Sequence, residues 1–282
     1  MVQKASPIRA TRGGPVGNVT RGTTNPNRMR RVDRWITGVH ARRFRALPAS
    51  PLAVDLGYGA SPATAVELFE RLRTVREDFC LTGIEIEPGR VAAAKPLERD
   101  GLDFRLGGFE LPVERAPALV RAFNVLRQYE EADVAGIWEL VCSRLAPGGL
   151  FVEGTCDEIG RRAAWVALDG DGPLTLSVAL RFGSFERPSD VAERLPKALI
   201  HRNVPGERIH GFLEALDSAW AAAAPLAPFG NRQRWITSVR SLKDAGWPIL
   251  HGPGRWRLGE LTVAWEAVAP IVTDARGAGL AR

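Results

Sequence analysis

The sequence predicts an α/β fold in which a mostly parallel sheet of seven strands is flanked by helices. First, residues 54–64 (VDLGYGASPAT) read as an apolar strand, a glycine-containing turn and a helix start. Second, apolar strand-like segments alternate with helix-periodic segments as far as residue 182. Third, residues 165–168 and 174–182 flank Asp169-Gly170-Asp171-Gly172, which indicates an antiparallel hairpin at one edge of the sheet.

The turn after the first strand has the composition of a cofactor-binding turn. The strand ends at Asp55, Gly57 and Gly59 lie in the turn, and Ser61-Pro62 suits an N-cap followed by the first helical position. Such a turn brings backbone N–H groups and the positive end of the helix dipole against a ligand. We therefore expect a nucleotide-type cofactor at this turn.

The second strand, residues 81–86 (LTGIEI), carries a carboxylate close to its end. In this position Glu85 can accept hydrogen bonds from both hydroxyls of an adenosine ribose. Glu87 is the alternative ligand, although Pro88 after it suggests that Glu87 instead starts a helix. The helix between the first two strands is expected from the spacing of Val66, Phe69, Leu72 and Val75.

Three further strands, the last of them preceded by a helix, continue the alternation of strands and helices. A third strand, residues 103–106, runs into Gly107-Gly108-Phe109-Glu110, a bend that could frame an adenine ring or be an ordinary turn. A fourth, residues 118–123, ends at Asn124. The next helix stops at Pro147-Gly148-Gly149, before a fifth strand over residues 150–155; its apolar positions are Val134, Ile137, Trp138, Val141 and Leu145.

Together these segments resemble the class I, Rossmann-like, S-adenosylmethionine-dependent methyltransferases. The resemblance covers roughly residues 50–182 and rests on VDLGYGA, GIEIEP, the glycine bend, the polar end of the fourth strand, and LAPGGLFVEG. A dinucleotide oxidoreductase would more often show a complete G-x-G-x-x-G. Two departures are the lack of an Asp after the third strand, and Asn124 where many family members carry Asp. The resemblance implies S-adenosylmethionine as cofactor, bound by Asp55, Gly57, Tyr58, Gly59, Glu85, Ile86, Gly108, Phe109 and Asn124.

The resemblance also implies in-line methyl transfer, which depends mainly on positioning the acceptor and needs a base only for a protonated nucleophile. We expect Asn124 to orient the acceptor, with Arg127 and Tyr129 as further catalytic candidates. Cys156 follows Thr155 as in RNA cytosine-C5 methyltransferases, but no second Pro-Cys follows the fourth strand, so a small structural cysteine is the favoured interpretation. Other polar groups expected at this crevice are Gln128, Glu153, Asp157 and Glu158.

Positive charge is concentrated near the N-terminus. Residues 1–45 carry a net charge of +10, whereas the whole chain has +6. We expect a disordered basic tail over residues 1–24 and an amphipathic helix within residues 25–50. Its outward arginines could track RNA phosphates, form an ordinary solvated face, or lie on a membrane surface; they are Arg28, Arg31, Arg34 and Arg42.

Residues 51–182 are expected to form the cofactor-binding core, and residues 183–282 a mainly helical cap. Tryptophans interleaved with arginines between Arg232 and Trp256 could stack on a nucleotide, but more often such residues anchor a core. His201 and His210 are too far apart for one helix face, so no metal site is expected.

The composition indicates where in the cell the protein is located, but it does not identify the methyl acceptor. Three separate cysteines, no signal-like segment and no apolar run near the roughly 20 residues of a membrane span favour a reducing cytoplasm. RNA is the expected acceptor, and a small molecule is the alternative. A module that binds S-adenosylmethionine without catalysis is a third possibility.

Overall fold

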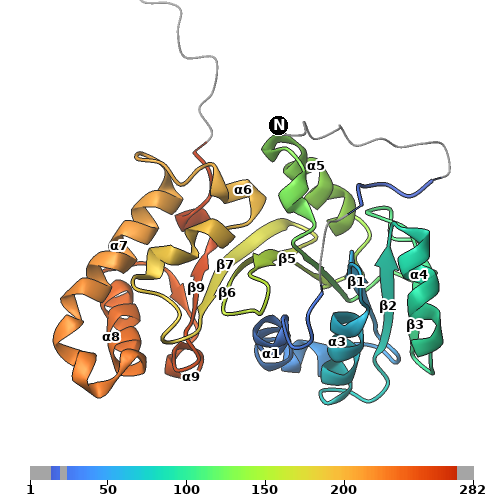
Figure 1. Ribbon diagram of the computed structural model, residues 1–282, viewed down its shortest axis with the longest axis horizontal. Helices are drawn as coiled ribbons and strands as arrows, with labels where there is room; N and C mark the ends of the chain where they lie inside the picture. Colours follow the sequence, from blue (N-terminus) through green and yellow to red (C-terminus); the bar gives the residue numbers. More distant parts are fainter. Residues whose placement is uncertain (1–13, 20–23, 272–282) are drawn as a thin grey trace, which may run out of the picture.

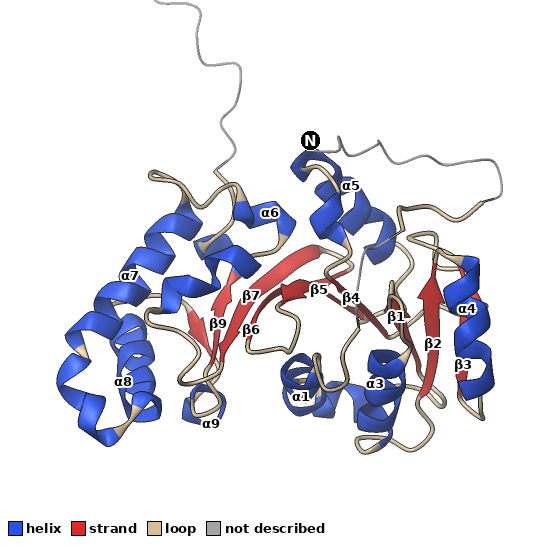
Figure 2. Ribbon diagram, viewed as in Figure 1, coloured by secondary structure: helices blue, strands red, loops and turns tan. Residues whose placement is uncertain are grey.

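The computed structural model describes residues 14–19 and 24–271, and within them one mixed sheet organises the chain (Figures 1 and 2). The sheet has nine strands in the order β3-β2-β1-β4-β5-β6-β7-β9-β8. The first five in this order are parallel, and the pairings from β5–β6 onward are antiparallel. The strands are β1 (Leu52–Leu56), β2 (Cys80–Glu85), β3 (Leu102–Leu106), β4 (Leu119–Phe123), β5 (Leu150–Cys156), β6 (Arg162–Asp169), β7 (Gly172–Leu180), β8 (Ile249–Leu250) and β9 (Glu260–Ala264).

Helices cover both faces of the parallel part of the sheet, with α5 on one face and α1 and α3 on the other (Figure 1). This produces two apolar cores. Val54 and Leu56 of β1 pack in the core on the α5 side, whereas Ala53 packs in the core that contains α1 and α3. Alternate residues of a strand face opposite sides of a sheet, and every residue of β1 is buried because helices cover both faces. The helices are α1 (Arg30–Val39), α2 (Ala41–Arg45), α3 (Ala63–Arg73), α4 (Pro88–Ala94), α5 (Glu131–Cys142), α6 (Lys197–Ile200), α7 (Arg208–Ala222), α8 (Asn231–Asp244) and α9 (Pro253–Trp256).

The C-terminal region is less separate from the sheet than the sequence predicts. Besides α6 to α9 it contributes β8 and β9, so the sheet has nine strands and not the expected seven. In β9, Leu261 and Val263 are buried in the apolar core, while Thr262 on the opposite side exchanges a 2.8 Å hydrogen bond with Ser177 of β7. Long-range pairing with β7 decides the conformation of this segment, which local helical patterning does not reveal.

The N-terminal helix is tied to the sheet by a buried ion-pair network. Asp33 of α1 accepts hydrogen bonds from Arg121 of β4 and from Arg71 of α3. Arg121 is 1% exposed and also pairs in a bidentate manner with Asp55, at 2.9 and 2.7 Å. Burial alone would lower the pKa of Arg121, but the two carboxylates outweigh it and raise the pKa. The single acidic residue of the basic segment therefore helps to dock α1.

The arginines expected on the outer face of one N-terminal helix do not all face solvent, and of these four Arg31 and Arg34 lie in α1. Arg28 donates to the backbone carbonyls of Cys156 and Asp157, and Arg31 donates to that of Leu258. Arg34 and Arg42 are exposed, as predicted. The expectation of four outward arginines is therefore wrong for Arg28 and Arg31, because carbonyls at the ends of neighbouring elements lie within reach.

Among the residues that the structure describes, none of the helices combines the length and the apolar character needed to cross a bilayer.

Candidate functional site

The candidate site lies where the strand order reverses, between β1 and β4. In open α/β sheets, ligands bind at this point, beyond the carboxyl ends of the strands. Gly57 follows β1 with a φ of 70°, and a Cβ at this position would lie 2.7 Å from Cγ2 of Val125. A side chain here would therefore both strain the backbone and collide with Val125. The helix after the turn begins at Ala63, with Pro62 as its N-cap. The sequence predicts Ser61 as the N-cap, one residue earlier.

Glu85 lies at the end of β2 and fixes the glycine turn. Its carboxylate is 1% exposed and accepts hydrogen bonds from the N–H of Gly59 at 2.9 Å and of Ile86 at 3.0 Å. Arg90 lies 3.5 Å away. A carboxylate has about four lone-pair positions, so Glu85 retains the capacity to accept from a ligand hydroxyl.

Glu87, the alternative ribose ligand, has a different role. Its carboxylate accepts hydrogen bonds from the N–H groups of Gly89 and Arg90, each at 2.9 Å, and thereby caps the N-terminus of α4. A side chain used as an N-cap stabilises the helix by about 1 kcal/mol. The structure thus favours Glu85 as the residue that faces the site.

A third wall of the site follows β3. The N–H of Gly108 donates to the carboxylate of Glu110 at 2.8 Å, which closes the bend. The ring of Phe109 packs edge-on against Tyr129, with 5.4 Å between ring centroids. Burial raises the pKa of Tyr129 to about 12, so its hydroxyl stays protonated at neutral pH.

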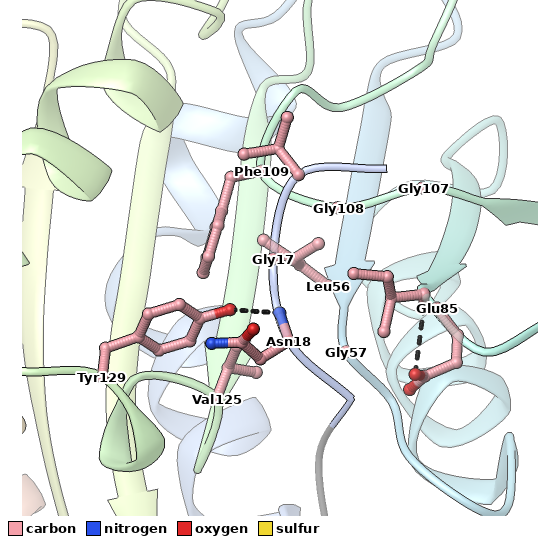
Figure 3. A pocket seen from close by; sticks show the side chains of 12 residues that line it. Gly17, Asn18, Leu56, Gly57, Glu85, Gly107, Gly108, Phe109, Val125 and Tyr129 are labelled. Atoms are coloured by element: carbon pink, nitrogen blue, oxygen red, sulfur yellow. Dashed lines mark hydrogen bonds between the residues drawn. The ribbon is translucent and has the colours of Figure 1, made fainter. Parts of the chain in front are cut away.

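These walls enclose a small cavity, which Figure 3 shows. Its free volume is about 20 Å³, enough for one water molecule. Of the predicted site residues, the cavity is lined by Gly57, Glu85, Ile86, Gly108, Phe109 and Tyr129. Gly107, part of the bend predicted after the third strand, also lines the cavity. Lining residues that the sequence analysis does not assign to the site are Val16, Gly17, Asn18, Leu56 and Val125.

Residues 14–19, hereafter the N-terminal strap, fill much of this site. The strap passes between Tyr129 on one side and Glu85 on the other (Figure 3). The sequence predicted disorder for residues 1–24, and for the described residues 14–19 this is wrong. Four hydrogen bonds to residues of the site hold the strap, and such long-range contacts leave no local sequence pattern.

Four of the predicted cofactor residues do not line the cavity, namely Asp55, Tyr58, Gly59 and Asn124. Asp55 faces the opposite side of the sheet, toward Arg121, because strand residues alternate between faces. Tyr58 packs edge-on against Phe104, 5.4 Å between centroids. Gly59 acts through its N–H, which donates to Glu85.

Two of the predicted catalytic residues also point elsewhere. Asn124 adopts a φ of 59°, and its side chain bonds Cys156, accepting from the backbone N–H at 3.1 Å and approaching Sγ at 3.5 Å. Arg127 donates to the backbone carbonyl of Glu193 at 2.9 Å. Tyr129 is therefore the member of the predicted catalytic set that reaches the cavity.

Two other groups expected near the crevice are buried beneath it. Glu153 is fully buried, and burial raises its pKa to about 8, which outweighs the opposite effect of the neighbouring Trp138. Cys156 lies 3.6 Å from Sδ of Met29, and burial raises the pKa of its thiol. A buried protonated thiol is a poor nucleophile, which supports the structural interpretation of Cys156.

Comparison with known proteins gives matches at the level of structure. No protein-family model and no curated protein sequence matches the chain. The plantazolicin methyltransferase BpumL, solved with a triazolic substrate analogue and S-adenosylhomocysteine (SAH), is 13% identical; the match covers 47% of this chain and 48% of that one, with a TM-score of 0.38. Human N-acetylserotonin methyltransferase, solved with S-adenosylmethionine, is 24% identical over 47% of this chain and 39% of that one, with a TM-score of 0.31.

The mitomycin 7-O-methyltransferase MmcR is 18% identical, and the match covers 44% of this chain and 38% of that one, with a TM-score of 0.32. The match spans between 38% and 55% of the length of the first matching structures. All three of these structures are methyltransferases, and each is similar to less than half of this chain.

Proposed function

We propose that the chain is an S-adenosylmethionine-dependent methyltransferase that acts on a small-molecule acceptor. The observation that carries this proposal is the convergence of the Gly57 turn, the buried carboxylate of Glu85 and the Gly107–Glu110 bend at the switch point of the sheet. Glycine allows a ligand to approach the backbone, and a buried carboxylate with remaining lone pairs selects hydroxyl donors. This set of groups suits an adenosine.

The residues present fit the cofactor in chemical terms. Glu85 would hold the ribose, and the bend after β3, with Phe109 beside it, would hold the adenine. When bound, S-adenosylmethionine supplies an electrophilic methyl group. The turn after β1 would place backbone N–H groups and the N-terminus of α3 near the rest of the cofactor.

Catalysis by this chain would rest on positioning rather than on a strong base. Tyr129 reaches the cavity with a protonated hydroxyl, which can donate a hydrogen bond that orients an acceptor. Asn124 would support the same wall indirectly by holding the end of β5 through Cys156. Orientation of the reacting groups at about 3–3.5 Å supplies much of the rate enhancement in such displacements.

A small-molecule acceptor is favoured over RNA by how the arginines are used. Two of the four arginines of the predicted RNA-binding face, Arg28 and Arg31, bond backbone carbonyls. The other two, Arg34 and Arg42, are exposed, as are Arg30 and Arg45 in the same segment. Counterion release requires several exposed cations along one surface. The alternative of a cofactor-binding module without catalysis is supported by the engagement of Asn124 and Arg127 away from the cavity.

The test uses labelled methyl groups. The protein is incubated with methyl-labelled S-adenosylmethionine and with separate RNA and metabolite fractions from cells that lack the gene. We expect label in the metabolite fraction, and clearly less of it with the Glu85→Gln variant. Label in RNA would establish an RNA acceptor, and SAH binding without transfer to either fraction would establish a non-catalytic module.

A further inference from the structure

The N-terminal strap uses the hydrogen-bonding groups of the bend after β3. The carbonyl of Val16 accepts from the N–H of Phe109 at 2.9 Å. The N–H of Val16 donates to the carboxylate of Glu110 at 2.7 Å. One residue of the strap therefore satisfies one donor and one acceptor of the bend at the same time.

The N–H and the carbonyl of Val16 present the same combination of one donor and one acceptor as the edge of an adenine ring. Adenine presents an amino donor beside a ring-nitrogen acceptor, so it would donate to Glu110 and accept from the N–H of Phe109. Val16 offers the same combination through its backbone. Val16 also lies very close to the backbone of Gly108, since a Cβ at Gly108 would be 2.0 Å from the carbonyl oxygen of Val16.

The strap is also held on the opposite wall of the cavity. The N–H of Asn18 donates to the hydroxyl of Tyr129 at 2.6 Å, and the side chain of Gln128 donates to the carbonyl of Asn18 at 2.9 Å. Between these anchors, Gly17 adopts a φ of 146°. Figure 3 shows Gly17 and Asn18 crossing the space that separates Tyr129 from Glu85.

We propose that the N-terminal strap is an autoinhibitory segment that competes with the adenosine part of the cofactor for the bend after β3. This proposal rests on the proposed function of the site. With the strap in place the cavity has about 20 Å³ of free volume, so an adenosine and the strap exclude one another. Cofactor binding then requires the strap to leave, and anything that weakens the strap raises the apparent affinity.

The strap can be displaced because its anchors are few and none of its six residues is fully buried. Two of its four hydrogen bonds involve Val16 and the other two involve Asn18. Val19, the last residue of the strap, is 52% exposed. Segments with few buried apolar contacts are the ones that open most readily in a native protein.

Gly17→Val in the full-length chain tests the proposal. A branched side chain at a φ of 146° is strained, and its Cβ would meet the Tyr129 hydroxyl at 3.0 Å, so the closed strap is destabilised. We expect SAH to bind about tenfold more tightly than to the unaltered chain, which corresponds to a strap closed for roughly nine-tenths of the time. Val19→Ala, at an exposed strap position, is the matched control and should leave the affinity unchanged.

Hydrogen exchange of the unaltered chain gives a second readout. The Val16 and Asn18 amides should be protected without ligand and should lose protection when SAH is saturating. Equal SAH affinity of Gly17→Val and the unaltered chain, or weaker binding by Gly17→Val, would overturn the strap's role while leaving the proposed function in place. Unchanged or stronger protection of the two amides would do the same. Absence of SAH binding to every chain would overturn both.

Discussion

The carboxylate of Glu85 accepts a hydrogen bond from the N–H of Gly59 at 2.9 Å, which joins the end of β2 to the turn after β1. The two residues are 26 positions apart in the sequence. The bond holds the glycine turn in place and orients the carboxylate toward the cavity. One residue thus both shapes the cofactor turn and offers the ribose ligand.

Replacement of Glu85 by Gln should weaken SAH binding about tenfold or more, because hydrogen bonds to a charged group are worth roughly 1.5–3 kcal/mol. Equilibrium dialysis with labelled SAH measures the loss. Glu87→Gln is the control: it affects the cap of α4 and should lower stability by about 1 kcal/mol or less while affinity is kept. If Glu87→Gln, and not Glu85→Gln, reduced the affinity, the ribose ligand would be Glu87.

Gly57→Val should abolish SAH binding. The φ of 70° disfavours any side chain, and the first side-chain carbon would lie 2.7 Å from Val125. Gly170→Ala is a suitable control, since nothing lies within 4 Å of a Cβ at that position. Both variants are checked by circular dichroism before fluorescence titration. A folded Gly57→Val chain with normal affinity would reduce the turn to a purely structural element.

Asp33→Ala should cost roughly 3–5 kcal/mol of unfolding free energy, because removing one member of a buried ion network leaves the others incompletely paired. Arg121 would keep Asp55 as its remaining carboxylate partner. Urea unfolding measures the difference, with Arg34→Ala, on the exposed side of the same helix, expected within about 0.5 kcal/mol of the unaltered chain. If Asp33→Ala also lowered the unfolding free energy by only about 0.5 kcal/mol, the ion network would contribute little to docking α1.

Glu153 should make the protein less stable as the pH rises. Its folded pKa of about 8 lies above the ordinary 4.5, so its contribution is complete below about pH 4.5 and is lost as the pH rises through 8. The loss is about 1.4 kcal/mol for each pH unit in this window, or roughly 5 kcal/mol in total.

The test for Glu153 compares urea unfolding at pH 5 and pH 9. Glu153→Gln should remove most of the decline, whereas Glu139→Gln, on the exposed side of α5, should keep it. An identical decline in the unaltered chain and in Glu153→Gln would assign the pH dependence to other groups.

Features governed by neighbouring residues were predictable from the sequence. The turn at Gly57 and the position of Glu85 follow from a strand, a glycine pattern and a second strand, and the structure has all three. Asp55 was placed in the site wrongly because the pattern gives the end of a strand but not which face each residue takes. The alternation of Val54 and Leu56 toward α5 puts Asp55 on the other face.

Features that depend on distant contacts were not predictable. Val16 meets Glu110 across 94 positions, and Asn18 meets Tyr129 across 111 positions. Nothing in the strap sequence, GPVGNV, indicates these partners. The pairing of β9 with β7 likewise depends on a distant contact. The alternation of apolar Leu261 and Val263 with polar Thr262 is nevertheless a local pattern typical of a strand.

Calorimetric titration of SAH into the full-length chain tests the central claim most directly. We predict saturable binding of about one ligand per chain, competed by S-adenosylmethionine and weakened about tenfold or more in Glu85→Gln. The absence of saturable binding both in the unaltered chain and in Gly17→Val, where the strap is weakened, would contradict the assignment of this site to S-adenosylmethionine.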